Sequence, residues 1–196
     1  EHSFPTRRSS DLWPKADVVV GNPPFLGNKK MIGELGEAYT ARLRKAYGDV
    51  PGGVDLVCYW FAKSWDQMEE GRLARAGLVA TNSIRGDTNR DVLKRIVEGG
   101  RIFNALSDEP WFDEKGAAVR VSIICFDVDG NGVVTLDGEE VPEIYSDLAK
   151  ARGGVDLTSA STLFQNRGAA FQGPVKVGAF DVEGDLARVW LSAPIN

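Results

Sequence analysis

Histidine and cysteine are scarce in this chain of 196 residues, which contains one histidine, His2, and two cysteines, Cys58 and Cys125. Within this chain, such low numbers exclude a Ser-His-Asp triad, a Cys-His nucleophile and a zinc site built from these residues. Two isolated cysteines do not make a disulfide framework, so we expect both to be small buried apolar residues in a reducing cytoplasm. We expect no metal site.

Long apolar runs and an overall positive charge are also missing. No stretch approaches the ~18 apolar residues that a membrane-spanning helix needs, so we expect no membrane partner. The net charge is −5, and it is uneven: residues 1–100 carry 15 Lys/Arg against 13 Asp/Glu, whereas residues 101–196 carry 8 against 15. Because DNA attracts proteins through its phosphates, we expect any nucleic-acid contact to come from a local groove, preferably in the first half.

The first twelve residues differ from the rest because they show no apolar periodicity. The segment TRRSSDL at 6–12 matches the translation of the end of a common sequencing adapter. We therefore expect residues 1–12 to be adapter read-through or a disordered tail. On that interpretation the natural protein begins upstream of Trp13, and its first part is missing here.

Strands and helices alternate over most of the remaining sequence, which is typical of an α/β fold. β-Branched apolar runs predict four strands, of which the first two are expected to be fully buried and parallel; they lie at 16–20, 77–81, 101–106 and 118–126. Apolar residues at helical spacing predict three helices, over 34–47, 54–70 and 88–98. After 128 the segments become short, acidic and rich in glycine, so we place a domain boundary there and expect an irregular β-rich extension over 129–196.

One motif indicates a chemical function: Asn22-Pro23-Pro24-Phe25 directly follows the first predicted strand. Ligands bind at the carboxyl ends of strands in open α/β sheets. Proline fixes its own φ and restricts the preceding residue, so the Asn22 side chain and the Pro23 carbonyl are held on a stiff turn. Two fixed acceptors suit an amino group with two hydrogens, and they stabilise the positive charge that grows as its lone pair attacks an electrophile. Phe25 offers a face on which a base can stack, worth about 1–3 kcal/mol; the alternative is a rigid turn with a core phenylalanine.

Asn-Pro-Pro-aromatic after a strand resembles the signature of amino-methyltransferases that use S-adenosylmethionine, and it is the catalytic motif of N6-adenine DNA methyltransferases. Four blocks together make the chain similar to the MmeI-like enzymes: GNPPFLGNKK at 21–30, GELGEAY at 33–39, VDLVCYWFAKS at 54–64 and AGLVATNSIRG at 76–86. Those enzymes are single-chain restriction–modification proteins of types IIG and IIL. They join endonuclease, methyltransferase and target-recognition parts, and the similarity covers about 13–196.

The resemblance implies a partial Rossmann-like sheet, the C-terminal half of a methyltransferase domain with helices on both faces, over 13–128. It implies a linker and the start of a target-recognition region over 129–196. The implied partner is double-stranded DNA with a flipped adenine in a prokaryotic cytoplasm, and the implied cofactor is S-adenosylmethionine. The glycine-rich segment that cradles this cofactor lies upstream of the motif in this class and is absent here. We therefore expect the isolated chain to be inactive.

The resemblance also assigns residues. Asn22, Pro23 and Pro24 fall on the catalytic turn and Phe25 on the stacking aromatic; Asn22 and Phe25 also fall on the part of the cofactor pocket that this chain contributes. Trp111 or Phe112 falls on a second aromatic that touches the flipped base, with a core or rim position as the alternative.

Three basic residues near the expected site have weaker assignments. Lys29 and Lys30 are candidates for phosphate contacts, and a solvated loop is the alternative. Arg85 is a candidate for a phosphate or cofactor contact, and a loop-positioning role is equally compatible with its place after the second strand.

Asp55, at the start of a predicted helix, is expected to favour the helix dipole.

Two other functions remain compatible with the sequence. Protein-glutamine and RNA-guanine methyltransferases also use Asn-Pro-Pro-aromatic, because the amino-group chemistry is the same. A scaffold or DNA-recognition subunit without catalytic activity is the third possibility.

Overall fold

The computed structural model describes residues 13–112, 118–150, 164, 168 and 183–192. The chain divides into two compact units, Glu1–Gly154 and Val155–Asn196. The tail predicted at 1–12 and most of the extension predicted beyond 150 lie outside the described residues. Within the described ranges, no helix is long and apolar enough to cross a membrane.

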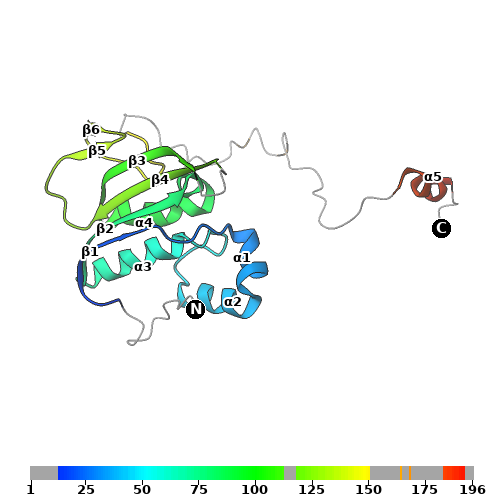
Figure 1. The fold of residues 1–196 in the computed structure, drawn as a ribbon, viewed down its shortest axis with the longest axis horizontal. Helices are drawn as coiled ribbons and strands as arrows, with labels where there is room; N and C mark the ends of the chain where they lie inside the picture. Colours follow the sequence, from blue (N-terminus) through cyan, green and yellow to red (C-terminus); the bar gives the residue numbers. More distant parts are fainter. Residues whose placement is uncertain (1–12, 113–117, 151–163, 165–167, 169–182, 193–196) are drawn as a thin grey trace. The chain divides into compact units, whose positions relative to one another are not determined.

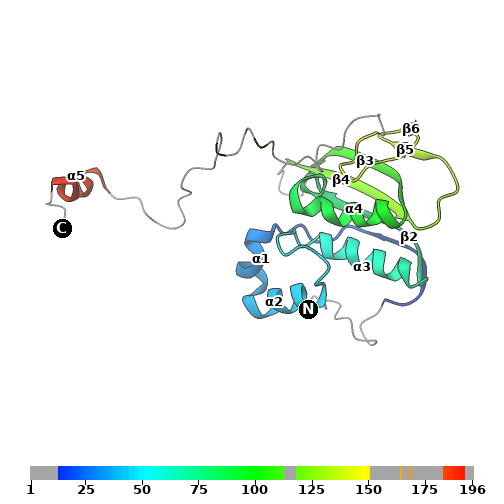
Figure 2. The same ribbon diagram turned by 180° about the vertical axis from the view of Figure 1, so that it is seen from behind.

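A six-stranded mixed sheet forms the first unit (Figures 1 and 2). Its strands, in spatial order, are β1 (Ala16–Gly21), β2 (Leu73–Thr81), β4 (Ala118–Asp127), β3 (Arg101–Phe112), β5 (Val134–Leu136) and β6 (Glu139–Val141). β1 and β2 are parallel, whereas β4 is antiparallel to both β2 and β3. The four predicted strands and the α/β class are confirmed. Because β5 pairs with β3, the sheet continues beyond residue 128, into the acidic, glycine-rich part of the sequence.

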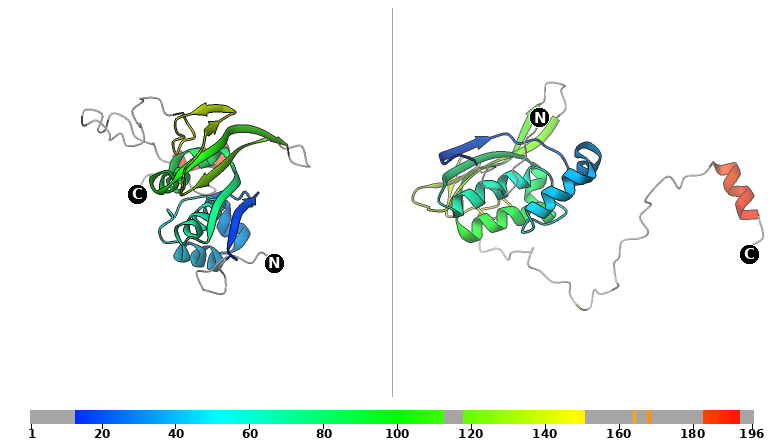
Figure 3. Two further views of the ribbon diagram at one scale, coloured as in Figure 1. Left: turned by 90° about the vertical axis from the view of Figure 1, so that its left-hand side faces the viewer. Right: turned by 90° about the horizontal axis from the view of Figure 1, so that it is seen from below.

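Among the described residues of the first unit there are also four helices and two short 3-10 turns, and α3 and α4 lie on one side of the sheet (Figure 3). The helices are α1 (Asn28–Leu35), α2 (Glu37–Ala46), α3 (Cys58–Glu69) and α4 (Arg90–Gly99), and the turns are Asn82–Arg85 and Asp87–Asn89. The single helix predicted over 34–47 is wrong because Gly36 has φ 85° and ψ 153°, which ends α1 and begins α2. α5 (Gly184–Ser192) belongs to the second unit.

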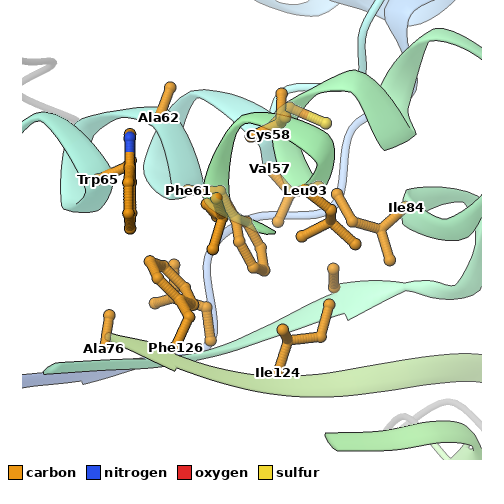
Figure 4. Packing of buried hydrophobic residues seen from close by; sticks show 14 of the residues in the cluster. Val57, Cys58, Phe61, Ala62, Trp65, Ala76, Ile84, Leu93, Ile124 and Phe126 are labelled. Atoms are coloured by element: carbon orange, nitrogen blue, oxygen red, sulfur yellow. The ribbon is translucent and has the colours of Figure 1, made fainter. Parts of the chain in front are cut away.

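The main hydrophobic core lies between the sheet and the helices α3 and α4 (Figure 4). Phe61 of α3 and Phe126 of β4 are stacked with ring centroids 5.7 Å apart. Trp65, one turn further along α3, is 1% exposed. This packing fixes α3 against the sheet. It therefore also fixes the segment before α3, which is hydrogen-bonded to the residues that follow the Asn-Pro-Pro-Phe motif.

The expectation that the first strand is fully buried is wrong. Val18 and Val20 are 55% and 81% exposed, whereas Val19 packs against the core. Successive side chains of a strand point to opposite faces, and α3 covers only the face of Val19. Within the described part of the chain, β1 pairs only with β2, so it forms an edge of the sheet.

Candidate active site

The Asn-Pro-Pro-Phe turn leaves the carboxyl end of β1, as the sequence predicts. Asn22 is exposed, Pro23 is buried and Phe25 is half-buried. Among the residues that the structure describes, the Asn22 amide makes no hydrogen bond. Its carbonyl oxygen is therefore available to a ligand, while the buried Pro23 fixes the backbone from which it projects.

The far end of this turn is tied to the segment that precedes α3. The Leu56 N–H donates to the Leu26 carbonyl oxygen at 2.9 Å. The Asn28 N–H, at the first position of α1, donates to Asp55 Oδ1 at 2.8 Å. Gly27, which precedes α1, has no side chain to cap the helix, so Asp55 satisfies an N–H group that otherwise has no helical partner.

Asp55 also binds the loop that follows β2. Its Oδ2 accepts hydrogen bonds from Ser83 Oγ and Asn89 Nδ2, both at 2.9 Å. Asn89 is 8% exposed, and its Oδ1 accepts the Asp55 N–H at 2.8 Å. Sequence reasoning assigned only a helix-dipole role to Asp55 and none to Asn89. The available signal was a carboxylate within the apolar block at 54–64.

A buried thiol lies next to this pair. Cys58 Sγ lies 3.4 Å from Asn89 Oδ1. Burial raises the pKa of the Cys58 thiol, and the nearby Asp55 charge raises it further. The thiol therefore remains protonated at neutral pH and serves as a small core residue, as the sequence analysis predicts for this cysteine.

Arg85 connects the loop after β2 to β3 and to a segment beyond β6. Its guanidinium donates to the backbone oxygens of Asp147 at 3.2 Å and Ser107 at 3.3 Å, and to Asn82 Oδ1 at 3.4 Å. These are contacts of a loop-positioning residue, the second of the two roles compatible with the sequence. Arg85 also lines a hollow of about 480 Å³, together with Asn82, Ser83, Gly86, Asn89, Asp147 and Ala149.

Lys29 and Lys30 are exposed in the first turn of α1. Neither forms an ion pair with any residue in the described ranges. Two unpaired positive charges thus lie within eight positions of Asn22 in the sequence, on the helix whose first N–H is bound by Asp55.

The predicted second aromatic lies on a projecting hairpin of β3 and β4. Pairing of β2 with β4 ends at Thr81 and Val121, while β3 and β4 remain paired as far as Phe112 and Ala118. The hairpin therefore extends past the carboxyl end of β2, on the side of the sheet where the carboxyl ends of β1 and β2 lie and where Asn22 follows β1. Trp111 on this hairpin is 39% exposed. The Phe112 side chain lies outside the described part of the structure.

Charged and polar side chains link the two strands of this hairpin to each other and to the loop after β2. Arg120 Nε lies 2.5 Å from Asp108 Oδ1, and its bond lowers the pKa of that carboxyl group. Asn82 Nδ2 donates to the same Oδ1 at 2.7 Å. The hairpin is thereby joined to the loop after β2, although no described contact joins Trp111 to Asn22.

Comparison with known proteins adds two kinds of finding. The family described as "MmeI, DNA-methyltransferase domain" matches residues 4–137. The structure of the type IIL restriction–modification enzyme MmeI in complex with DNA is similar, with 25% sequence identity and a TM-score of 0.57 over 72% of this chain and 20% of that chain. This chain thus spans about a fifth of that enzyme's length. No curated protein matches.

Two further solved structures are more distant. A modification subunit of a putative type I restriction enzyme from Vibrio vulnificus is 15% identical, with a TM-score of 0.44 over 58% of this chain and 23% of that chain. A structure of a type I restriction–modification system is 17% identical, with a TM-score of 0.44 over 68% of this chain and 26% of that chain.

Proposed function

Because the chain belongs to the family of MmeI DNA-methyltransferase domains, we propose that it holds the target base in a restriction–modification protein that methylates adenine N6 in double-stranded DNA. The observation that carries this proposal is the Asn22 amide. It is exposed and has no hydrogen bond among the described residues, and it lies on a proline-fixed turn at the carboxyl end of a parallel strand.

The chemistry follows from two oxygen acceptors. Asn22 Oδ1 and the Pro23 carbonyl oxygen accept the two N–H groups of the adenine amino group. As the N6 lone pair forms a bond to the methyl carbon, the bond from that carbon to the donor sulfur breaks and its electron pair stays on sulfur. Positive charge meanwhile grows on nitrogen, and both acceptors would stabilise that charge in place. The nitrogen afterwards loses one proton to solvent, so no general base from this chain is required.

The residues around Asn22 also fit a methyl donor and a base. S-adenosylmethionine would supply the methyl group when bound, and Asn22 and Phe25, which follow the carboxyl end of β1, are the residues that we expect to contribute to its pocket. The half-buried Phe25 ring supports the flipped adenine by stacking, and flipping costs a few kcal/mol that the site must offset.

Residues further from the turn complete the proposal. Trp111, on the hairpin at the same sheet edge, is the candidate for a second contact with the base. The exposed Lys29 and Lys30 are candidates for phosphate contacts beside the flipped nucleotide.

The test compares substrates for the full-length protein that contains this chain. Purified protein is incubated with methyl-labelled S-adenosylmethionine and, in parallel, with duplex DNA, a peptide-release factor and ribosomal RNA. We expect label only in DNA, recovered as N6-methyladenine after digestion to nucleosides. Label in the release factor or in RNA would favour the other amino-methyltransferases, and no label in any substrate would favour a non-catalytic recognition role.

A further inference from the structure

The turn that carries Asn22 and the loop after β2 are joined by a single side chain from a third segment, that of Asp55. We propose that Asp55 is a positioning residue for methyl transfer: it fixes the NPPF loop (residues 22–27) against the second loop (residues 82–89) and so holds Asn22 in its working direction. This inference rests on the proposed function and assigns a further residue to it.

Asp55 and its neighbour hold the end of the NPPF loop at two points. Asp55 Oδ1 accepts the Asn28 N–H at 2.8 Å, across 27 positions of sequence, and the Leu56 N–H donates to the Leu26 carbonyl oxygen at 2.9 Å. Arg44 adds a third restraint because its Nη2 donates to Asn28 Oδ1 at 2.9 Å. The loop therefore enters α1 at one place and in one direction.

The opposite oxygen of Asp55 holds the second loop. Oδ2 accepts from Ser83 Oγ and from Asn89 Nδ2, each at 2.9 Å. Asn89 is nearly buried, and it returns a bond through its Oδ1 to the Asp55 N–H at 2.8 Å. With both oxygens and its N–H engaged, the Asp55 carboxylate has one orientation.

The anchored end of the loop controls Asn22 because the residues between them are stiff. Pro23 and Pro24 each have φ fixed near −65°, and proline restricts the residue before it. A displacement at Leu26 is therefore passed through Phe25 and the two prolines to Asn22, with little freedom to absorb it. Misplacement of a reacting group by about 1 Å can cost roughly 100-fold in rate.

The polarity of the contacts explains why a carboxylate stands at this position. All three partners of the Asp55 oxygens are donors: a backbone N–H, a hydroxyl and an amide NH₂. Asn at position 55 has the same shape, but it directs an NH₂ group toward the Asn89 NH₂ group. Changing Asn89 to Asp at the same time restores a donor opposite an acceptor, although it removes the 3.3 Å bond from Asn89 Nδ2 to the Ser83 carbonyl oxygen. The double variant D55N/N89D is therefore designed as a partial rescue.

The first experiment measures the loop itself in this chain of 196 residues, by hydrogen–deuterium exchange followed at single amides. In Asp55→Ala, which removes the acceptor of the Asn28 N–H, we expect the Asn28 amide to exchange roughly 5-fold faster or more, the effect of losing one hydrogen bond, while the amides of β2 and β4 are unchanged. Glu34→Gln, which removes one exposed carboxylate from α1, is the matched control and leaves Asn28 protected. Equal Asn28 protection in wild type and Asp55→Ala would overturn the proposal.

The second experiment measures DNA methylation by the full-length protein. Asp55→Asn is expected to lower kcat about 100-fold while KM for DNA changes less than about 3-fold, because positioning acts on the transition state. D55N/N89D is expected to recover at least about 10-fold of that loss, which a merely destabilised loop would not do. An unchanged kcat in Asp55→Asn, or a double variant no better than Asp55→Asn, would overturn the role of Asp55 alone. A wild-type protein that does not methylate DNA would overturn the proposed function and, with it, this role.

Discussion

The indole of Trp65 lies directly against the last residue of α4: a Cβ added to Gly99 would stand 2.7 Å from Trp65 Cζ2. Gly100, the next residue, is equally close, since its Cβ would lie 2.8 Å from Trp65 Cη2. The two glycines thus do more than end a helix, because they allow α4 to approach α3 across the core.

Alanine at position 99 is therefore expected to destabilise the fold. The added methyl group forces the buried indole or the end of α4 to move, and overpacking of this kind costs about 1–3 kcal/mol. Gly33→Ala is the matched control: nothing lies within 4 Å of its Cβ position, so in α1 it should stabilise by about 0.5–1 kcal/mol. Urea unfolding of this chain measures both, and equal stability of Gly99→Ala and wild type would contradict the packing described.

Asp127 ends β4 in a buried position and is bound by two arginines. It is 2% exposed, with Arg101 Nε at 2.9 Å and Arg75 Nε at 3.5 Å. We expect Asp127→Ala to lower the free energy of unfolding by about 3 kcal/mol, since it leaves the Arg101 guanidinium without its buried partner. Arg75→Gln, which changes a half-exposed side chain, should cost less than about 1 kcal/mol. A loss in Arg75→Gln as large as the loss in Asp127→Ala would contradict the assignment of Arg101 as the main partner.

Stability should fall at alkaline pH because of Cys58. Its folded-state pKa is raised by burial and then by Asp55, so the folded protein keeps a proton that the unfolded chain releases. The contribution of the Cys58 thiol to the free energy of unfolding is complete below the unfolded-state pKa of about 8.5. It is lost as pH rises above that pKa, at about 1.4 kcal/mol per pH unit. Between pH 7.5 and 9.5, Cys58→Ala should show a flatter decline than wild type, measured by urea unfolding. Parallel curves would mean that Cys58 does not contribute.

Lys29 and Lys30 should contribute to DNA affinity through charge alone. Each phosphate contact makes the slope of log K against log salt more negative by about 0.9, so replacing both lysines by Gln should make that slope less negative by about 1.8 in the full-length protein. Lys94→Gln on α4, where the side chain is 57% exposed and lies 4.0 Å from Glu98, is the matched control with no expected change. An unchanged slope in the double variant would place Lys29 and Lys30 in solvent and not on DNA.

Local patterns in the sequence predicted the strands well and predicted where the Asn-Pro-Pro-Phe turn begins. β-Branched runs and the two prolines act within a few residues, so these features are readable without the fold. The break at Gly36 was missed because apolar spacing continues across it. The exposure of Val18 and Val20 was missed because a run of valines does not reveal which strands or helices cover it.

Long-range contacts account for the rest of the site. Asp55 meets Asn28 across 27 positions and Asn89 across 34, and no local pattern pairs them. The extension of the β3–β4 hairpin past β2 likewise depends on where β2 ends. It places Trp111 beside the carboxyl ends of β1 and β2, where Asn22 also lies. The resemblance had assigned Trp111 or Phe112 to a contact with the base, but the sequence alone did not place either one there.

We propose above all that the Asn22 side chain accepts a hydrogen bond from the amino group that becomes methylated. The direct test is single-turnover methylation of duplex DNA by the full-length protein with Asn22 changed to Ala or to Asp, with circular dichroism as the check on folding. Ala removes the acceptor and should lower the rate by at least about 100-fold, whereas Asp keeps an oxygen at the same place and should retain more activity than Ala. A folded Asn22→Ala protein that methylates DNA at the wild-type rate would contradict the account.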